Sequence, residues 1–589
     1  MPEPVITRRV VPDPADLASP EADFGCEGLA FGVLAAVAAL MAAGYVLDLA
    51  GRTMHPVGLA LGFVAAGVAV GWTFRVTSVF GRTSRHAGFL VVVAASTSYF
   101  LWLASPEFLP VTIGPDVVHH LQLIHFIQRT HALPHAAGLN PFLLEMMNYT
   151  PGSHILAASV ADWFRLDALR VLQPLTAVFV AVKLGMLYLL ALRVVPGSRS
   201  APVAALSVPV LALVPAVYTI GSSFHFFFYA QVISETFAIG VLLAAVCWSE
   251  TRATRDLIVA AVCGMGVLLS WPVWLGPAAL TMIFVIVRAP LSWRSRVAAT
   301  IIALGPPVLF GLAHALLHTE GGRILASSGA VTEPSVAAFG AAFLVLAAGG
   351  AILSWRVRGV RPVVVFLAAA LLQAAALAVL AVRAGTHGFY LPFKMMYLIV
   401  FPAAVLGAVA LIVVAEYLSV RVPRVRAAAL LLPIVVAVAV AAGRVPVARQ
   451  KSPMTLSALR AGVWAREHAS VECVDYFTTH WLTGYWLHLD VLGNPRDSDR
   501  MRVETFEFRD SVGKWLEGRG LRYGIVEDLD AIPYELRPDL TVLESFSPFT
   551  VVRNERGRCP GGRVGSDPRS ARSGGSRGQS SFRVLAKYR

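Results

Sequence analysis

The sequence predicts a polytopic α-helical membrane protein with about thirteen transmembrane helices and a small C-terminal α/β domain. The chain has 589 residues, of which 56% are hydrophobic and only 14% are charged, whereas soluble proteins carry about 25% charged residues. Apolar blocks of about 20 residues, the length that crosses a bilayer, recur from position 28 to position 442. Mixed strand-like and helical segments follow. These observations exclude a soluble cytoplasmic enzyme, a disordered protein, a collagen and a disulfide scaffold.

The N-terminal segment is polar and rich in proline, and the first apolar block starts too far downstream for a cleaved signal peptide. We therefore expect a cytoplasmic tail over residues 1–27, followed by an uncleaved first helix. A transmembrane region over residues 28–442 comes next. Its apolar blocks lie at 28–49, 56–75, 87–104, 168–194, 201–220, 234–250, 256–272, 274–288, 297–317, 335–354, 362–382, 395–417 and 426–442.

Arginine residues predict the orientation of these helices. Basic gaps are placed on the cytoplasmic side of a membrane by the positive-inside rule. The six basic gaps are 75–85, 193–199, 252–255, 288–296, 356–361 and 421–426. Alternation between them gives thirteen crossings, with the N-terminus cytoplasmic and the chain after residue 443 extracytoplasmic. The short apolar segment 151–164 then lies in the outer leaflet or re-enters, because an even number of crossings must separate the first two gaps.

The region after the last apolar block has a different pattern. Short strand-like runs at 471–477, 521–526, 540–543 and 550–552 alternate with helical stretches. This alternation predicts a small extracytoplasmic α/β domain over residues 443–553. Residues 554–589 are rich in Gly, Ser and Arg and predict a disordered basic tail.

The five cysteines form no CxxC pair, so no metal knuckle or redox motif is indicated. Cys473 and Cys559 could form a disulfide if both face an oxidising compartment. Against this pairing, Cys559 falls within the segment predicted to be a disordered tail.

The net charge of +13 does not indicate a nucleic-acid partner, because most arginines lie in the short gaps that set membrane orientation. A second group lies in the tail after Arg553. The chain contains no P-loop, no HExxH and no complete GxGxxG outside a membrane block. Nothing therefore indicates ATP hydrolysis or a nicotinamide cofactor.

The large loop over residues 105–151 concentrates histidines around one carboxylate. After Pro115, a residue favoured at a helix start, the sequence predicts a helix on which Asp116, His119 and His120 share one face. Such a group can act as a base, hold a divalent metal or, with protonated histidines, bind a phosphate. The alternative is an interfacial amphipathic helix without a catalytic role. No cofactor is certain, and a divalent metal stays open.

Other ionisable residues lie at the outer ends of apolar blocks, where a functional role is the default hypothesis. Lys394 and Arg383, with His387 between them, could neutralise a phosphate close to the bilayer surface. For Lys394 the alternative is snorkelling to the interface. Glu235 follows a run of aromatic residues, and the alternative for it is an ion pair with a neighbouring helix.

Taken together, these motifs resemble the multi-pass glycosyltransferases of the GT-C superfamily, in particular the actinobacterial-type members that use polyprenyl-phosphate sugars. That family carries an acidic motif in its first large extracytoplasmic loop, and a stretch like YPPGxH then leads into a short helix. Here the matching residues are Asp116 with His119 and His120, followed by residues 149–154 (YTPGSH). Lys394 in FYLPFKMMY resembles the basic residue that such proteins place near a late helix, and the soluble C-terminal domain is also similar.

The resemblance implies a polyprenyl-phosphate sugar as donor, with its phosphate against Lys394 and Arg383. It implies a cell-envelope glycan, lipid or protein as acceptor, whose hydroxyl group Asp116 would deprotonate, with inversion at the anomeric carbon. His119 and His120 would orient the acceptor or hold a metal. The substrate-binding residues that we expect are Lys394, Arg383, Glu235, His154 and His387. Trp481, Tyr485 and Trp486 could stack on sugars or could form a small core.

Two features depart from the family pattern: Asp116 is a single carboxylate rather than a pair, and the large loop follows the third crossing. The second feature predicts two additional N-terminal helices. A transporter or flippase for a lipid-linked or polar substrate is one alternative, although we find no clear internal repeat and the ionisable residues lie at outer ends. A non-catalytic membrane scaffold is the other. Convergence of Asp116, Lys394 and Glu235 on one cavity would favour the enzyme.

Overall fold

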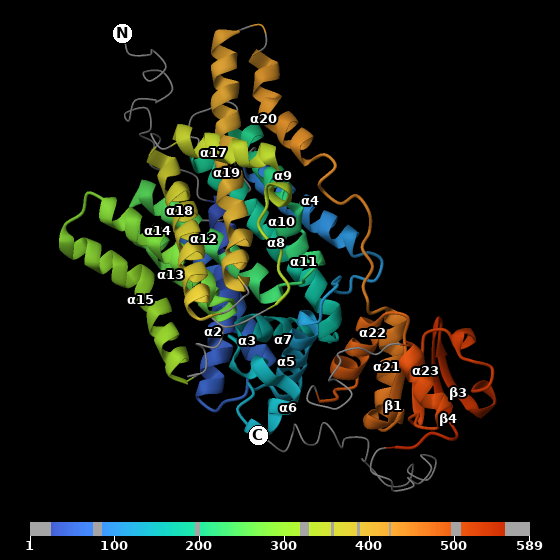
Figure 1. The fold of residues 1–589 in the computed structure, drawn as a ribbon. Helices are drawn as coiled ribbons and strands as arrows, with labels where there is room; N and C mark the ends of the chain where they lie inside the picture. The colour runs from blue at the N-terminus through green and yellow to red at the C-terminus, as the bar shows by residue number, and fades with distance from the viewer. Residues whose placement is uncertain are drawn as a thin grey trace.

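The protein is a bundle of helices that carries a small α/β domain at one end (Figure 1). The computed structural model describes residues 25–74, 85–194, 201–317, 329–354, 358–385, 389–422, 424, 426–495 and 508–559. The predicted fold class, a polytopic α-helical membrane protein with a small C-terminal α/β domain, is confirmed. Most of the predicted N-terminal tail and residues 560–589 of the predicted basic tail lie outside the described residues.

Each of the thirteen apolar blocks contains at least one α-helix. The helices are α2 (Gly25–Leu49), α3 (Pro56–Thr73), α4 (Arg85–Leu103), α8 (Ala168–Val194), α9 (Ala201–Leu213) with α10 (Ala216–Thr219), α12 (Tyr229–Thr251), α13 (Thr254–Ser270), α14 (Leu275–Arg288), α15 (Trp293–Leu317), α16 (Val336–Phe339) with α17 (Ala341–Ser354), α18 (Arg361–Arg383), α19 (Tyr390–Arg421) and α20 (Arg426–Ala441).

Seven of the described helices are long and apolar enough to cross a membrane, so the chain is a multi-pass membrane protein. A bent pair, Ala205–Leu213 with Ala216–Phe224, would make an eighth span. Four further apolar helices have 10–17 residues, fewer than the roughly 20 of a typical crossing. The number of thirteen crossings therefore stays a prediction.

The helices differ in how deeply they lie in the bundle. The apolar 18-residue stretch of α12 is entirely buried inside the protein, whereas only 6% of the corresponding stretch of α3 is buried. The helix α3 packs on α2 along one side, and a Cβ atom on Gly32 would lie 3.2 Å from the carbonyl oxygen of Gly67. Small residues permit this close approach of two helices, and the remaining apolar surface of α3 is left to face lipid.

The loop predicted over residues 105–151 folds into helical segments at the end of the bundle that carries the α/β domain, here called the domain end (Figure 1). It contains α5 (Asp116–Thr130) and α6 (Asn140–Leu143), and α7 (Gly152–Phe164) follows directly. The 13 residues of α7 span about 20 Å, less than the roughly 30 Å of a bilayer core. The length of α7 therefore agrees with the prediction that this segment does not cross the membrane.

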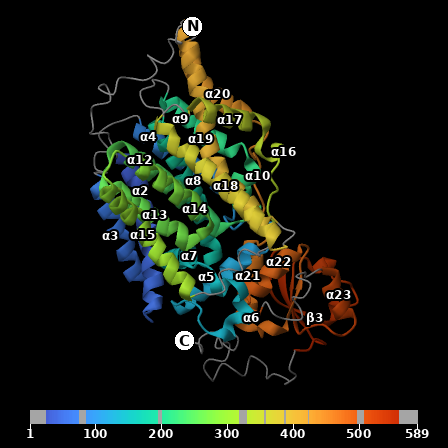
Figure 2. The same ribbon diagram turned by 60° about the vertical axis from the view of Figure 1, so that its left-hand side comes forward.

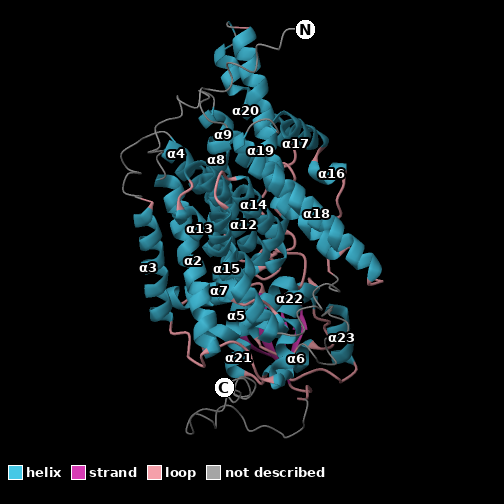
Figure 3. Cartoon of the chain, turned by 90° about the vertical axis from the view of Figure 1, so that its left-hand side faces the viewer, coloured by secondary structure: helices cyan, strands magenta, loops and turns pink. Residues whose placement is uncertain are grey.

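The C-terminal domain is built on a four-stranded sheet with the order β1-β2-β4-β3. β1 pairs with β2 in parallel, and the other pairs are antiparallel. Within the described residues, Figure 3 shows strands only in this domain. Its elements are α21 (Leu456–His468), β1 (Val474–Phe477), α22 (Trp481–Trp486), a π-helical turn (Leu487–Val491), α23 (Phe508–Leu516), β2 (Tyr523–Val526), β3 (Leu540–Phe546) and β4 (Phe549–Asn554).

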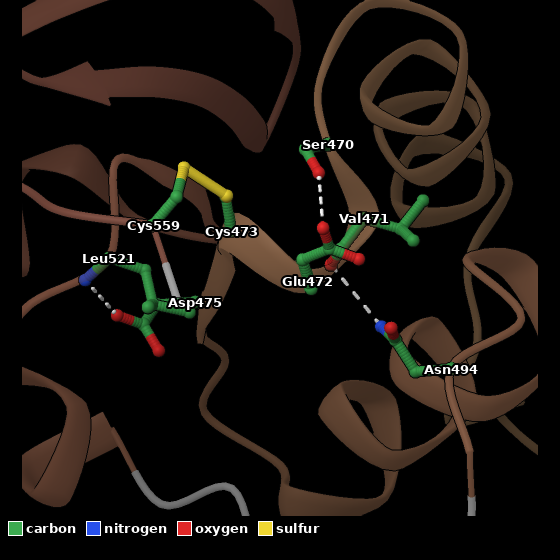
Figure 4. Close-up of a disulfide and its surroundings, with 8 residues drawn as sticks. All are labelled: Ser470, Val471, Glu472, Cys473, Asp475, Asn494, Leu521 and Cys559. Atoms are coloured by element: carbon green, nitrogen blue, oxygen red, sulfur yellow. Dashed lines mark hydrogen bonds between the residues drawn. A yellow bond between two sulfur atoms is a disulfide. The ribbon is translucent and has the colours of Figure 1, made fainter. Parts of the chain in front are cut away.

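A disulfide joins Cys473 to Cys559 next to this sheet (Figure 4). The backbone N–H of Arg558 also donates to the carbonyl oxygen of Gly520 at 3.2 Å. The described chain therefore stays attached to the domain as far as Cys559, six residues beyond the end that the sequence pattern predicted. Cys559 does not lie in a detached tail.

Candidate functional site

The candidate site lies at the domain end of the bundle, and Asp116 forms part of it. Asp116 is the first residue of α5 and is partly buried. A carboxylate in this position is stabilised by the positive end of the helix dipole. Asp116 interacts electrostatically with Lys394, Tyr149 and Tyr390. A carboxylate, an ammonium group and two phenols from three separate parts of the chain therefore lie within electrostatic range of one another.

His120 and His154 form a buried pair. The distance from His120 Nδ1 to His154 Nε2 is 2.8 Å, and the ring of Tyr149 meets both imidazoles edge-on at centroid distances of 5.3 and 5.4 Å. Burial and then the neighbouring charges of His119 and Lys394 lower the pKa of His120 to about 3, although Glu145 opposes this shift. His120 is therefore neutral at physiological pH and can both donate and accept a hydrogen bond.

His119 faces a different direction from His120. Its Nε2 atom lies 2.8 Å from the hydroxyl group of Tyr485, and its Nδ1 atom lies 3.2 Å from Glu145 Oε1. Tyr485 belongs to the C-terminal domain, whereas Glu145 belongs to the turn between α6 and α7. His119 therefore connects the C-terminal domain to the edge of the candidate site.

Lys394 lies in the first turns of α19 and is only 2% exposed. Its Nζ atom sits 2.7 Å from the ring centroid of Phe228, 5.0 Å from that of Tyr390 and 5.9 Å from that of Tyr397. Aromatic faces attract a cation, and here they cover the ammonium group instead of leaving it extended to the surface. Within the described residues, Lys394 makes no hydrogen bond and no ion pair, so an anion could still bind it.

Glu235 is close enough to act electrostatically on Lys394, but its own oxygens have partners inside the bundle. Lys183 Nζ on α8 donates to Glu235 Oε2 on α12, and Gln231 Nε2 donates to Glu235 Oε1 at 3.3 Å. Both members of the Lys183–Glu235 pair are fully buried. This arrangement is the helix–helix ion pair that the sequence left open as the alternative for Glu235.

Breaking this ion pair is expected to destabilise the bundle. The substitution Lys183→Met leaves the Glu235 carboxylate buried and unpaired, which costs about 3–5 kcal/mol in the free energy of unfolding. The double variant Lys183→Met/Glu235→Leu is expected to recover most of that loss, because no buried charge remains. Thermal unfolding in detergent measures the stability of both variants. A Lys183→Met variant as stable as the wild type would contradict the structural role of the ion pair.

The structure does not connect Arg383 to the site. Arg383 is exposed in the last turn of α18 and makes no side-chain hydrogen bond or ion pair with any described residue. His387 lies outside the described residues. The phosphate-binding role of these two residues stays a prediction.

The three side chains considered for a divalent metal do not fit one shared ion. His119 directs its ring nitrogens to Tyr485 and Glu145, whereas His120 directs Nδ1 to His154. Across the described part of the chain, no group of three or more His, Cys, Asp or Glu side chains is placed to hold a metal. We therefore derive no step through a metal.

Glu145 was not identified from the sequence, and the roles of Phe228 and Tyr485 were left open. Glu145 lies four residues before Tyr149, the first residue of the YTPGSH motif. This proximity was the signal in the sequence that could have identified it. Phe228 belongs to an aromatic run that is equally typical of a membrane interface. Tyr485 was considered for sugar stacking, but it is only 1% exposed, so its ring is not open to a sugar.

A second set of contacts fixes the C-terminal domain on α5, and Figures 1 and 2 show the two side by side. His125 lies 2.7 Å from Asp490 and 3.2 Å from Asp167. Asp490 belongs to the π-helical turn of the C-terminal domain, and Asp167 lies between α7 and α8. His125 therefore joins the domain to the membrane region through two carboxylates.

The docking of the C-terminal domain is expected to weaken at alkaline pH. Burial lowers the pKa of His125, but Asp490 and Asp167 raise it to about 9 overall. Arg129 interacts electrostatically with both carboxylates, and Arg466 interacts with Asp167. Because the folded pKa exceeds the unfolded value of about 6.5, this stabilisation, about 3 kcal/mol, is complete below pH 6.5 and is lost as pH rises through about 9.

Limited proteolysis of the purified protein between pH 7 and pH 9.5 measures this docking. The wild type is expected to become more sensitive to cleavage near residue 450 as pH rises, whereas His125→Gln is expected to be sensitive throughout. Equal protection of the wild type at both ends of the pH range would contradict the role of His125.

Comparison with known proteins finds similarity only among solved structures, since no family model and no curated protein matches the sequence. ArnT from Cupriavidus metallidurans bound to undecaprenyl phosphate superposes with a TM-score of 0.39 at 13% identity, over 79% of this chain and 98% of that one. The mycobacterial arabinofuranosyltransferase AftD gives a TM-score of 0.45 at 16% identity, over 79% of this chain and 40% of that one.

The Archaeoglobus fulgidus oligosaccharyltransferase tethered with an acceptor peptide gives a TM-score of 0.42 at 15% identity, over 74% of this chain and 69% of that one.

Proposed function

We propose that this chain is a membrane glycosyltransferase that moves a sugar from a polyprenyl-phosphate donor to a cell-envelope glycan, lipid or protein acceptor, with inversion. One observation carries the proposal: residues of the motifs that resemble such enzymes come together in space. Asp116 and His120 from α5, Tyr149 and His154 from the next motif, and Lys394 from α19 surround one site.

Lys394 supplies the binding chemistry for the donor. A buried ammonium group is costly unless an anion compensates it, and among the described residues it has aromatic neighbours but no direct ionic partner. A phosphate group is an anion suited to this position. Phe228, Tyr390 and Tyr397 add apolar surface beside it, which suits the first isoprene units of a lipid tail.

Asp116 supplies the general base. Its carboxylate takes the proton of the acceptor hydroxyl group, and the acceptor oxygen attacks the anomeric carbon of the sugar. The bond between this carbon and the phosphate oxygen breaks, and the electron pair leaves with the phosphate. Lys394 stabilises the negative charge that develops on the leaving group, so the two residues act on opposite ends of one displacement. A single displacement inverts the anomeric configuration.

The paired histidines support this geometry without titrating. Because His120 is neutral, its hydrogen bond with His154 persists over the physiological pH range. The pair holds α5 against α7 and packs against Tyr149. In this way the histidines fix the position of the helix that begins with Asp116.

Two observations support an extracytoplasmic location of the site. The positive-inside rule assigns the chain after residue 443 to the outside, and the C-terminal domain that contacts α5 belongs to that part. The disulfide between Cys473 and Cys559 is typical of an oxidising compartment. Nucleotide sugars are cytoplasmic, so a donor on this side has to be lipid-linked.

Sugar transfer by the purified, reconstituted protein tests the proposal. The assay supplies a panel of radiolabelled polyprenyl-phosphate sugars with a cell-envelope glycan extract, and a parallel series supplies nucleotide sugars. We expect incorporation from a lipid-linked donor only, with inverted anomeric configuration in the product. Incorporation from a nucleotide sugar, or none from any lipid-linked donor that a control enzyme can use, would contradict the proposal.

A further inference from the structure

The contact surface between α5 and the C-terminal domain contains a hydrogen bond that reaches the candidate site. The Tyr485 hydroxyl group lies 2.8 Å from Nε2 of His119, and Nδ1 of the same ring lies 3.2 Å from Glu145 Oε1. Both ring nitrogens of His119 therefore have a partner. One partner comes from the C-terminal domain, and the other lies in the segment that leads to Tyr149.

The two partners also restrict how the His119 ring can be turned. A carboxylate only accepts hydrogen bonds, so Nδ1 carries the proton and donates it to Glu145. Nε2, on the opposite side of the ring, is then the atom that meets the hydroxyl group of Tyr485. Glu145 in turn acts electrostatically on His120 and Tyr149. The orientation of His119 thus bears on the charge distribution around the site.

The Tyr485 hydroxyl group is held in place by the fold of the C-terminal domain. Tyr485 lies on α22, where Trp481 packs edge-on against its ring at 5.9 Å. Thr483 on the same helix donates to the carbonyl oxygen of Pro453 at 2.6 Å. A π-helical turn follows. Such turns are rare in proteins, but those that occur are often found at functional sites. Asp490 of this turn bonds to His125.

We infer that Tyr485 is a positioning residue of the candidate site. Its hydroxyl group fixes the ring of His119, so the site is complete only when the C-terminal domain is docked on α5. This inference rests on the proposed glycosyltransferase function, and it gives the C-terminal domain a role in catalysis beyond covering the helix.

The experiment compares two Tyr→Phe variants of the full-length, reconstituted protein. Tyr485→Phe removes the hydrogen bond to His119. Tyr476→Phe is the matched control, because its buried hydroxyl group also bonds to a histidine, His488, at 3.1 Å, but within the C-terminal domain. Two measurements are made on each variant. The first gives kcat and KM for sugar transfer, and the second gives the rate of acylation of His119 by diethyl pyrocarbonate, mapped by mass spectrometry.

For Tyr485→Phe we expect kcat to fall about tenfold, the equivalent of one hydrogen bond, with the donor KM unchanged. We also expect faster acylation of His119, since Nε2 loses its partner. Tyr476→Phe is expected to match the wild type in both measurements. Wild-type values for Tyr485→Phe, or equal losses in both variants, would overturn the inference.

The acylation measurement separates this inference from the proposed function. If the wild type transfers no sugar, the proposed function fails, but the reactivity of His119 still decides whether Tyr485 holds the ring. Unchanged acylation in Tyr485→Phe would then overturn the positioning role by itself.

Discussion

Asp116→Asn is expected to lower kcat for sugar transfer by about 10²–10⁴-fold, the contribution of a general base. The amide keeps the size of the side chain but cannot take the proton of the acceptor hydroxyl group. Donor affinity is expected to change little, because the phosphate binds to Lys394. Steady-state kinetics with varied donor and acceptor separate these effects.

Asp162→Asn is the matched control for this substitution. Asp162 lies on α7 and faces His131 at 3.6 Å, away from the candidate site, so the control variant is expected to keep the wild-type kcat. Full activity of Asp116→Asn would remove Asp116 from the mechanism. The second carboxylate near Tyr149, Glu145, would then be the next residue to test as the base.

Lys394→Met is expected to lower kcat/KM by about 10²–10³-fold, the usual effect of removing one group that stabilises developing charge. The side chain of methionine fits among the same aromatic rings, so folding is preserved. Because the ammonium group also binds the ground-state phosphate, the affinity for polyprenyl phosphate falls as well. Binding of the lipid is measured directly, by the change in thermal stability with lipid concentration.

The control is the same substitution at Lys451, which is exposed in the segment before α21. Lys451→Met is expected to bind polyprenyl phosphate as the wild type does. A Lys394→Met variant with unchanged lipid affinity and unchanged kcat/KM would show that the phosphate binds elsewhere, and Arg383 would be tested next.

Much of the fold could be predicted because the two sequence patterns that indicate it are local. Blocks of apolar residues predicted the helices of the bundle, and alternating short runs predicted β1, β2, β3 and β4. The end of the C-terminal domain was less predictable. The segment up to Cys559 is polar and rich in Gly and Arg, and a disulfide to a residue 86 positions earlier holds it in place. No local pattern reports such a contact.

The site was predictable only in part, for a geometric reason. Asp116, His119 and His120 were expected to share a face of α5, but His119 and His120 are about 100° apart around a helix. The helix α5 lies between α7 and the C-terminal domain. His120 therefore meets His154 on one side, and His119 meets Tyr485 on the other.

The remaining differences between the predicted and the observed site arise from partners that lie far away in the sequence. Glu235 had the sequence context of a functional carboxylate, but its partner Lys183 lies 52 residues away on another helix. The same limit applies to Tyr485, which is 366 residues from His119. Residue types and spacing along the chain indicate candidates, whereas their pairing depends on how the helices pack.

A structure of the protein with a bound polyprenyl phosphate tests the central claim most directly. The measured quantity is the distance from Lys394 Nζ to the nearest phosphate oxygen. The account predicts a hydrogen-bonded ion pair of about 2.7–2.9 Å, with Asp116 on the side where the sugar would be attached. A phosphate bound away from Lys394, or a lipid that leaves Asp116 facing away from its headgroup, would contradict the account and favour a transporter or a scaffold.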